Sequence, residues 1–147
     1  VPAPPAPREE LIGAAPSSRA AAARVLVAED DTATRALIER VLSGRGYAVT
    51  TAADGTQALR LAGSGAFDLI LSDVNMPGLD GLRLLELLAN QGVRAPVLLL
   101  TAEAGDAVEL QGLALGAVDF VRKPVSKEVL LMRVERALGH LRKGTGT

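Results

Sequence analysis

The chain has 147 residues, with 16 Lys and Arg against 17 Asp and Glu, no Cys, one His, two Phe and one Tyr. A formal charge of −1 and so few aromatic rings argue against nucleic-acid binding, and a chain without Cys forms no disulfide, zinc–thiolate site or thiol nucleophile. The length fits one domain with a tail, a cytoplasmic location is expected, and the apolar runs are far shorter than the ~20 residues of a membrane span.

The first 22 residues are rich in Pro and Ala and offer little to bury. We interpret residues 1–22 as a linker to another domain, with a short helix near 8–13 or 19–23 as the alternative. Because the chain begins at Val1 and not at Met, we expect it to be part of a longer protein.

From Arg24 onward, short apolar runs alternate with amphipathic stretches, which predicts βαβ units around a parallel sheet. In chain order we predict strand 24–28, helix 32–43, strand 47–52, a helix capped by Asp54, strand 67–72, helix 82–91, strand 96–100, helix 107–115, strand 118–121 and helix 127 to about 141. We expect Leu37, Val41 and neighbouring residues on one face of the first helix, and a core stripe on the last helix made of Leu131, Val134, Leu138 and Leu141.

Strands as apolar as residues 96–100 must be covered on both faces, so the expected fold is a doubly wound α/β domain. We place this domain at residues 23–142 and expect a flexible tail at 143–147. In such folds, ligands bind beyond the carboxyl ends of the strands.

Polar side chains follow four of the five predicted strands. They are Glu29, Asp30 and Asp31 after the first strand, Asp73 after the third, Thr101 after the fourth and Lys123 after the fifth. Each has an ordinary explanation, such as an acidic helix N-terminus or a turn, but unrelated causes would not place one at four strand ends. Carboxylates ~4 Å apart repel by about 4 kcal/mol at an effective dielectric of 20, so the cluster indicates a divalent cation, best Mg²⁺.

Four segments resemble the receiver domains of bacterial two-component response regulators, the CheY-like family. They are VLVAEDD (25–31), DLILSDVNMPGLDG (68–81), LLLTA (98–102) and GAVDFVRKP (116–124). The resemblance covers about residues 24–141 and implies a flavodoxin-like five-stranded parallel sheet of order 2-1-3-4-5 with helices on both faces. It also implies a signalling phosphoacceptor, not an enzyme, that takes a phosphoryl group from a histidine kinase or a histidine phosphotransfer domain and then changes conformation.

The resemblance assigns roles to individual residues. Asp73 is the phosphorylated nucleophile, assisted by Thr101 and Lys123. Mg²⁺ is held by Asp30, Asp73 and the backbone carbonyl of Asn75, and Glu29 holds a metal-bound water. Thr101 and Phe120 form the conformational switch, with ordinary packing in an edge strand as the alternative for Phe120.

Two positions are expected to set the lifetime of the phosphoryl group. By the same resemblance, the side chains of Asn75 and Glu103 line the path of the attacking water. For Glu103, we favour a plain exposed acid ahead of a helix, and the role in phosphoryl lifetime is a hypothesis.

The acidic cluster has three alternative interpretations. A phosphohydrolase of the haloacid-dehalogenase type usually carries a second Asp two residues after its nucleophile, where this chain has Asn75. A dinucleotide-binding domain would have glycines after the first strand, and a P-loop is absent. A docking module that works without phosphorylation would not need the full set of acids, hydroxyl and ammonium.

The sequence says less about output and partners. No effector domain is visible after Leu141, and we expect no membrane or nucleic-acid partner. Asp119 and Arg133 match part of the family's charged dimer face, whereas His140 and other positions depart from it, so a monomer or a weak dimer is expected. The parent protein is interpreted as a hybrid histidine kinase or, second, a multi-domain regulator.

Overall fold

The computed structural model describes residues 22–102 and 106–146. In chain order the elements are β1 (Arg24–Ala28), α2 (Thr32–Gly44), β2 (Ala48–Ala52), α3 (Gly55–Ser64), β3 (Leu69–Asp73), α4 (Gly81–Asn90), β4 (Val97–Thr101), α5 (Asp106–Ala114), β5 (Asp119–Arg122) and α6 (Lys127–Gly146). Glu103 and residues 1–21 of the expected linker (1–22) lie outside the described residues.

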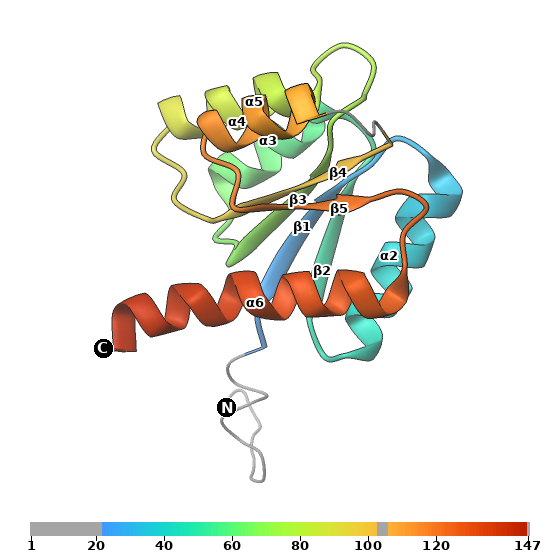
Figure 1. The fold of residues 1–147 in the computed structure, drawn as a ribbon, viewed down its shortest axis with the longest axis vertical. Coiled ribbons are helices and arrows are strands. Elements are labelled where there is room, and N and C mark those ends of the chain that lie inside the picture. Colours follow the sequence, from blue (N-terminus) through green and yellow to red (C-terminus); the bar gives the residue numbers. More distant parts are fainter. Residues whose placement is uncertain (1–21, 103–105, 147) are drawn as a thin grey trace, which may run out of the picture.

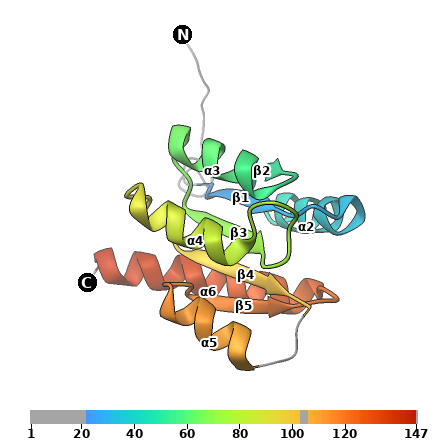
Figure 2. The same cartoon turned by 90° about the horizontal axis from the view of Figure 1, so that it is seen from above.

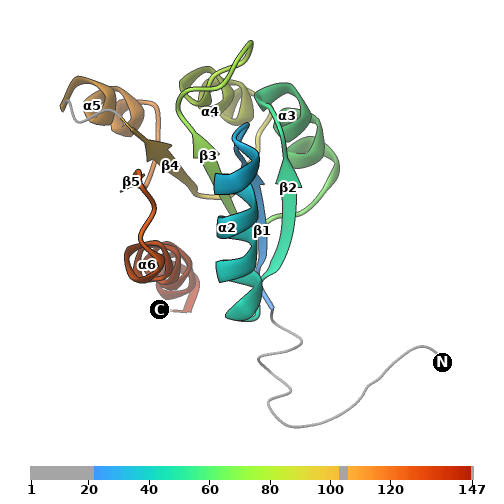
Figure 3. The ribbon, with the colours of Figure 1, turned by 90° about the vertical axis from the view of Figure 1, so that its right-hand side faces the viewer.

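The five strands form one parallel sheet of order β2-β1-β3-β4-β5, which confirms the predicted fold class (Figure 2). Helices α3, α4 and α5 lie on one face of the sheet, and α2 and α6 lie on the other (Figures 1 and 3). Since the strands are parallel, their carboxyl ends meet at one edge of the sheet.

Alternation along the strands divides the core between the two faces. Leu26 and Ile70 pack with the α3 and α4 side chains, whereas Val25, Leu69 and Leu71 pack with those of α2 and α6. All of these strand residues have no exposed surface. The central strands are apolar along their whole length because both faces are covered.

Aspartates at the carboxyl-end edge start three of the helices. The side chains of Asp31, Asp54 and Asp80 accept a hydrogen bond from the backbone N–H three residues later, at the beginning of α2, α3 and α4. Each cap satisfies one N–H that the helix leaves without a partner. The predicted cap at Asp54 is confirmed.

Three details differ from the expectations. Asp73 and Thr101 belong to β3 and β4, because the backbone ladder continues past the apolar run, as in the 2.8 Å bond from Val74 N–H to the Leu100 carbonyl. On α2, Ile38 and Leu42 are fully buried and the predicted Val41 is partly buried against the same core, whereas the predicted Leu37 is 36% exposed. One residue rotates the helical face by about 100°, and only packing on the sheet selects the direction.

The last helix is longer than expected. It runs to Gly146, past the predicted end near Leu141 and through most of the expected tail. No proline follows Pro124, so nothing in the sequence prevents the backbone hydrogen bonds from continuing. Three members of its predicted core stripe are buried, Leu131, Val134 and Leu138, and the side chain of the fourth, Leu141, lies outside the described part of the chain. None of the described helices combines the length and apolarity needed to cross a membrane.

Candidate acidic site at the carboxyl ends of the strands

The buried polar residues of the described chain gather at one edge of the sheet. They are Glu29, Ser72, Asp73 and Thr101, at the carboxyl ends of β1, β3 and β4. Burying a carboxylate is costly unless it is paired or binds a cation. The clustering of two buried carboxylates at this edge therefore marks it as a functional site.

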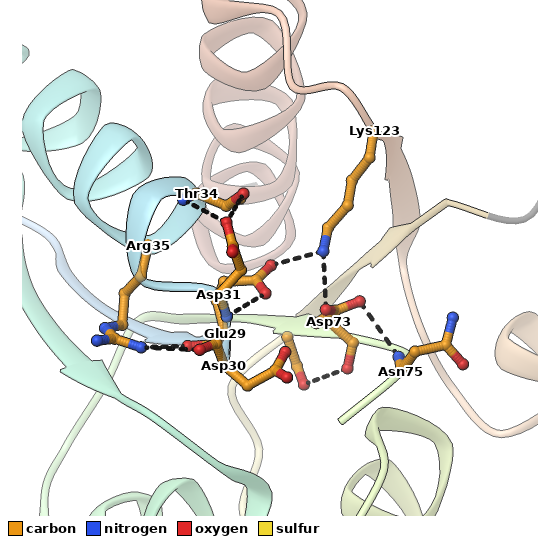
Figure 4. A network of polar contacts seen from close by, with 9 residues as sticks. Glu29, Asp30, Asp31, Thr34, Arg35, Asp73, Asn75 and Lys123 are labelled. Carbon is orange, nitrogen blue, oxygen red and sulfur yellow. Dashed lines mark hydrogen bonds and ion pairs between the residues drawn. The ribbon is translucent and has the colours of Figure 1, made fainter. Parts of the chain in front are cut away.

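Lys123 joins the two buried carboxylates. Its Nζ lies 2.8 Å from Asp73 Oδ2 and 2.9 Å from Glu29 Oε1 (Figure 4). Its backbone N–H donates to the Thr101 carbonyl at 2.9 Å, which ties the segment after β5 to the end of β4. The predicted convergence of the first, third, fourth and fifth strand ends is therefore present.

The acids form a group that suits a small cation. Glu29, Asp30 and Asp73 each offer an oxygen atom within 4.8 Å of the others. Three carboxylates face one ammonium here, so their formal sum is −2. Glu29 Oε1 is buried, and within the described residues its partner is Lys123, through an ion pair without a well-formed hydrogen bond. These oxygens fit Mg²⁺, a hard cation that prefers carboxylate ligands.

The environment shifts the pKa values of this pair. Burial raises the pKa of Glu29 above its ordinary value, and the nearby Asp73 carboxylate raises it further, against the opposing bonds from Lys123 and the Asp31 N–H. For Lys123, burial works to lower the pKa, but the bonds to Asp73 and Glu29 outweigh it and the pKa is raised. Lys123 therefore stays protonated, as an electrophilic partner requires.

Asn75 and Asp31 occupy distinct places around the site. The Asn75 N–H donates to Asp73 Oδ1 at 3.2 Å, while its side chain is exposed and turned away from Asp73 in Figure 4. Asp31 is exposed and caps α2, and its bonds with Thr34 lower its pKa. Its backbone N–H also holds Glu29 Oε2 at 3.0 Å.

The two predicted switch residues lie on neighbouring strands. Thr101 ends β4, one residue beyond Leu100, the partner of Asp73 in the parallel ladder, and is 1% exposed. Phe120 lies in β5 with its ring buried at 9% exposure. A β-carbon at Gly112 of α5 would lie 3.1 Å from this ring, so the ring packs directly under the glycine.

Sequence reasoning missed two residues that shape the site. A β-carbon on Gly81 would lie 2.2 Å from the carbonyl oxygen of Asp73, so only glycine lets α4 start this close to the acidic edge. Arg35 of α2 donates to the backbone carbonyl of Glu29 at 2.8 Å. An arginine near the positive end of a helix is electrostatically unexpected, and that signal was available in the sequence.

The comparisons with known proteins agree with this geometry. The family model for the response regulator receiver domain matches residues 25–135. Response regulator MprA of Mycolicibacterium vanbaalenii is 42% identical over 115 residues, which cover 78% of this chain and 50% of that protein. The chain thus spans about half the length of the curated relatives it matches.

Solved structures show the same fold. The chemotaxis protein CheY4 of Vibrio cholerae superposes with a TM-score of 0.75 and 38% identity, covering 80% of this chain and 100% of that one. The signal receiver domain of a signal transduction histidine kinase from Syntrophus aciditrophicus has a TM-score of 0.75 and 33% identity, covering 82% of this chain and 93% of that one. The chain belongs to the response regulator receiver domain family, the CheY-like signalling domains of two-component systems.

Proposed function

We propose that Asp73 is the residue that accepts the phosphoryl group, with Lys123 and Thr101 as its catalytic partners. The observation that carries this proposal is the position of Lys123 Nζ, 2.8 Å from Asp73 Oδ2 and 2.9 Å from Glu29 Oε1. It places a fixed positive charge beside the carboxylate that would attack phosphorus.

The proposed transfer is a single displacement. An oxygen of Asp73 forms a bond to phosphorus while the N–P bond of a phosphohistidine breaks, and the electron pair of that bond returns to the imidazole. Negative charge develops on the phosphoryl oxygens, so fixed donors matter more than covalent help. Lys123 supplies a charged donor, and the Thr101 hydroxyl supplies a second donor to a phosphoryl oxygen.

Receiver domains bind Mg²⁺ at an acidic cluster. We propose Asp30, Asp73 and the Asn75 carbonyl as the Mg²⁺ ligands here, with Glu29 holding a metal-bound water. The ion, when bound, would supply positive charge to the phosphoryl oxygens. Glu29 Oε1, which is buried and in the described chain is paired with Lys123 without a well-formed hydrogen bond, supports this assignment, as does the net negative charge of the cluster.

We further propose that Thr101 and Phe120 transmit the phosphorylation state. Thr101 ends the strand that separates β3 from β5, so a bond from its hydroxyl to the phosphoryl group would pull on the end of β4. The buried ring of Phe120 lies beneath α5 and is the side chain expected to respond. Since Phe has no hydroxyl, an outward ring would gain no hydrogen bond.

The phosphohydrolase alternative finds no support in the site. That chemistry uses an acid two residues after the nucleophile, and the residue there is Asn75, whose exposed side chain points away from Asp73. The family assignment also disfavours this reading.

Receiver domains interact with histidine kinases and phosphotransfer partners. For this chain we propose a cytoplasmic setting, a partner of that class and a monomer or weak dimer. Within the chain, Arg133 donates to both carboxylate oxygens of Asp119 at 3.0 and 3.1 Å. The likeness to a histidine kinase's receiver supports a hybrid kinase as parent, and the likeness to MprA supports a multi-domain regulator.

The proposal is tested by exposing the domain to acetyl phosphate with Mg²⁺ or with EDTA. We expect a shifted band on a phosphate-affinity gel only with Mg²⁺, and we expect borohydride reduction followed by peptide mass spectrometry to place the modification at Asp73. A modification at another residue, or one that is equal in EDTA, would contradict the assignment.

A further inference from the structure

Arg35 makes a contact with the site that its charge alone does not explain. It lies near the start of α2, and its side chain turns back toward the end of β1 (Figure 4). Its Nη1 atom donates to the Glu29 carbonyl at 2.8 Å and lies 3.5 Å from the Asp30 carbonyl. In the described chain Arg35 has no ion pair with the acidic group.

Asp30 is the least constrained of the three acids. Its neighbours are both held: the Glu29 N–H donates to the Ala52 carbonyl at 3.1 Å, and Asp31 caps α2. The Asp30 carboxylate is exposed, and no hydrogen bond or ion pair is formed by it within the described residues. The direction of that side chain therefore depends on the backbone at Glu29 and Asp30, which Arg35 contacts through its Nη1 atom.

From these contacts we infer that Arg35 is a positioning residue for the metal site. Its hydrogen bond to the Glu29 carbonyl holds the backbone so that the Asp30 carboxylate faces the oxygens of Glu29 and Asp73. Because the guanidinium binds a carbonyl oxygen, it occupies none of the carboxylate oxygens that a cation would bind. This inference rests on the proposed Mg²⁺ site and goes beyond it by naming a residue outside the ligand set.

Charge and positioning predict opposite signs for the effect of Arg35 on Mg²⁺ binding. A positive charge close to a cation site weakens binding through space, so loss of that charge alone would tighten binding. Loss of a residue that orients a ligand typically weakens metal affinity tenfold or more. The sign of the change therefore identifies the role.

The test compares Arg35→Met with Arg40→Met in the intact 147-residue chain. Both variants remove one positive charge from α2 and keep a long apolar side chain, but Arg40 is exposed and has no contact with the acidic site. We expect Arg35→Met to weaken Mg²⁺ binding, measured by calorimetry, by roughly tenfold. Arg40→Met should bind Mg²⁺ as the parent does or slightly more tightly.

A second measurement needs no metal. The Asp31 amide, held by Glu29 Oε2 at 3.0 Å, should exchange with deuterium faster in Arg35→Met than in Arg40→Met, with both in EDTA. Equal or tighter Mg²⁺ binding by Arg35→Met would overturn the inference, as would a variant that fails to fold in EDTA, because Arg35 would then support the whole domain. If the parent chain binds no Mg²⁺, the proposed metal site itself is wrong, and the inference falls with it.

Discussion

The two edges of the sheet are built from the same five strands but differ in what they bury. At the carboxyl ends, Glu29 and Asp73 are buried beside Lys123. At the amino ends, Arg24 and Asp68 are exposed, and a mainly apolar hollow of about 630 Å³ is lined by residues such as Val97 and Leu115. In the described chain no carboxylate is buried at the amino ends, so the buried charges at the carboxyl ends need a functional explanation.

The difference between the two ends of the strands is tested most directly by neutralising one acid at each end of β3. Asp73→Asn should abolish Mg²⁺-dependent phosphorylation by acetyl phosphate, because the amide is not a nucleophile of this kind. Asp68→Asn removes the same charge just before β3, where the side chain accepts a hydrogen bond from the Arg24 N–H, and should leave the reaction unchanged. Phosphate-affinity gels measure both. Loss of the reaction in Asp68→Asn as well would show that the contrast between the edges is not functional.

Removal of the ammonium should have the next largest effect. Lys123→Met leaves Glu29 and Asp73 without their shared cation, so we expect phosphorylation to slow on the order of 100-fold and the metal-free domain to lose about 3 kcal/mol of unfolding free energy. Lys127→Met, at an exposed position at the start of α6, is the control. Time courses of phosphorylation measure the rate, and urea unfolding in EDTA measures the free energy of unfolding. If Lys123→Met were phosphorylated as fast as Lys127→Met, Lys123 would have no part in the mechanism.

The closeness of α4 to the acidic edge can be tested at Gly81. An alanine there would place its β-carbon 2.2 Å from the Asp73 carbonyl oxygen, so the loop must move, and we expect a loss of about 2 kcal/mol together with slower phosphorylation. At Gly44, where a β-carbon would meet no atom within 4 Å, the same substitution should cause neither change. Thermal unfolding and the acetyl phosphate assay measure the pair. Equal stability of both variants would mean that this contact is easily relieved.

The smallest effect concerns pH. Since the folded state raises the pKa of Glu29 above the ordinary value of 4.5, the folded domain binds this proton more tightly than the unfolded chain. The contribution of Glu29 to the free energy of unfolding therefore decreases as the pH rises from about 4.5 through the higher pKa of Glu29 in the folded state. In EDTA, the free energy of unfolding of Glu29→Gln should not show this decrease. The stability of the variant relative to the parent should therefore increase from pH 4.5 toward neutrality.

Added Mg²⁺ separates the metal from the proton in the same experiment. It should stabilise the parent more than the Gln variant, because the ion compensates the buried charge only where that charge is present. Urea unfolding at several pH values measures the difference. A parallel pH dependence in the two proteins would contradict the raised pKa of Glu29.

The elements of the fold were largely predictable because their signals are local. The apolar runs marked all five strands, and Asp54 marked the start of a helix. The errors have a common cause. The face of α2 and the last residues of β3 and β4 depend on neighbouring elements, which the pattern along one segment does not contain.

The candidate site was predictable in its membership but not in its contacts. Parallel strands bring their carboxyl ends to one edge, so Glu29, Asp30, Asp73 and Lys123 were expected together, and they are. No pattern in the sequence indicated that Lys123 bridges Glu29 and Asp73. None indicated that Arg35 donates a hydrogen bond to the backbone carbonyl of Glu29. These contacts depend on side-chain directions set by the packed fold.

The sequence by itself determined the class of the fold, the strand ends at which chemistry gathers and the acidic character of the site, because periodicity and strand polarity are properties of short segments. Only the tertiary structure decided which carboxylates are buried, which cation they share and how near α4 stands to Asp73. The reason is physical: burial, hydrogen bonding and electrostatic pairing act between atoms that are far apart along the chain and meet only when the layers pack.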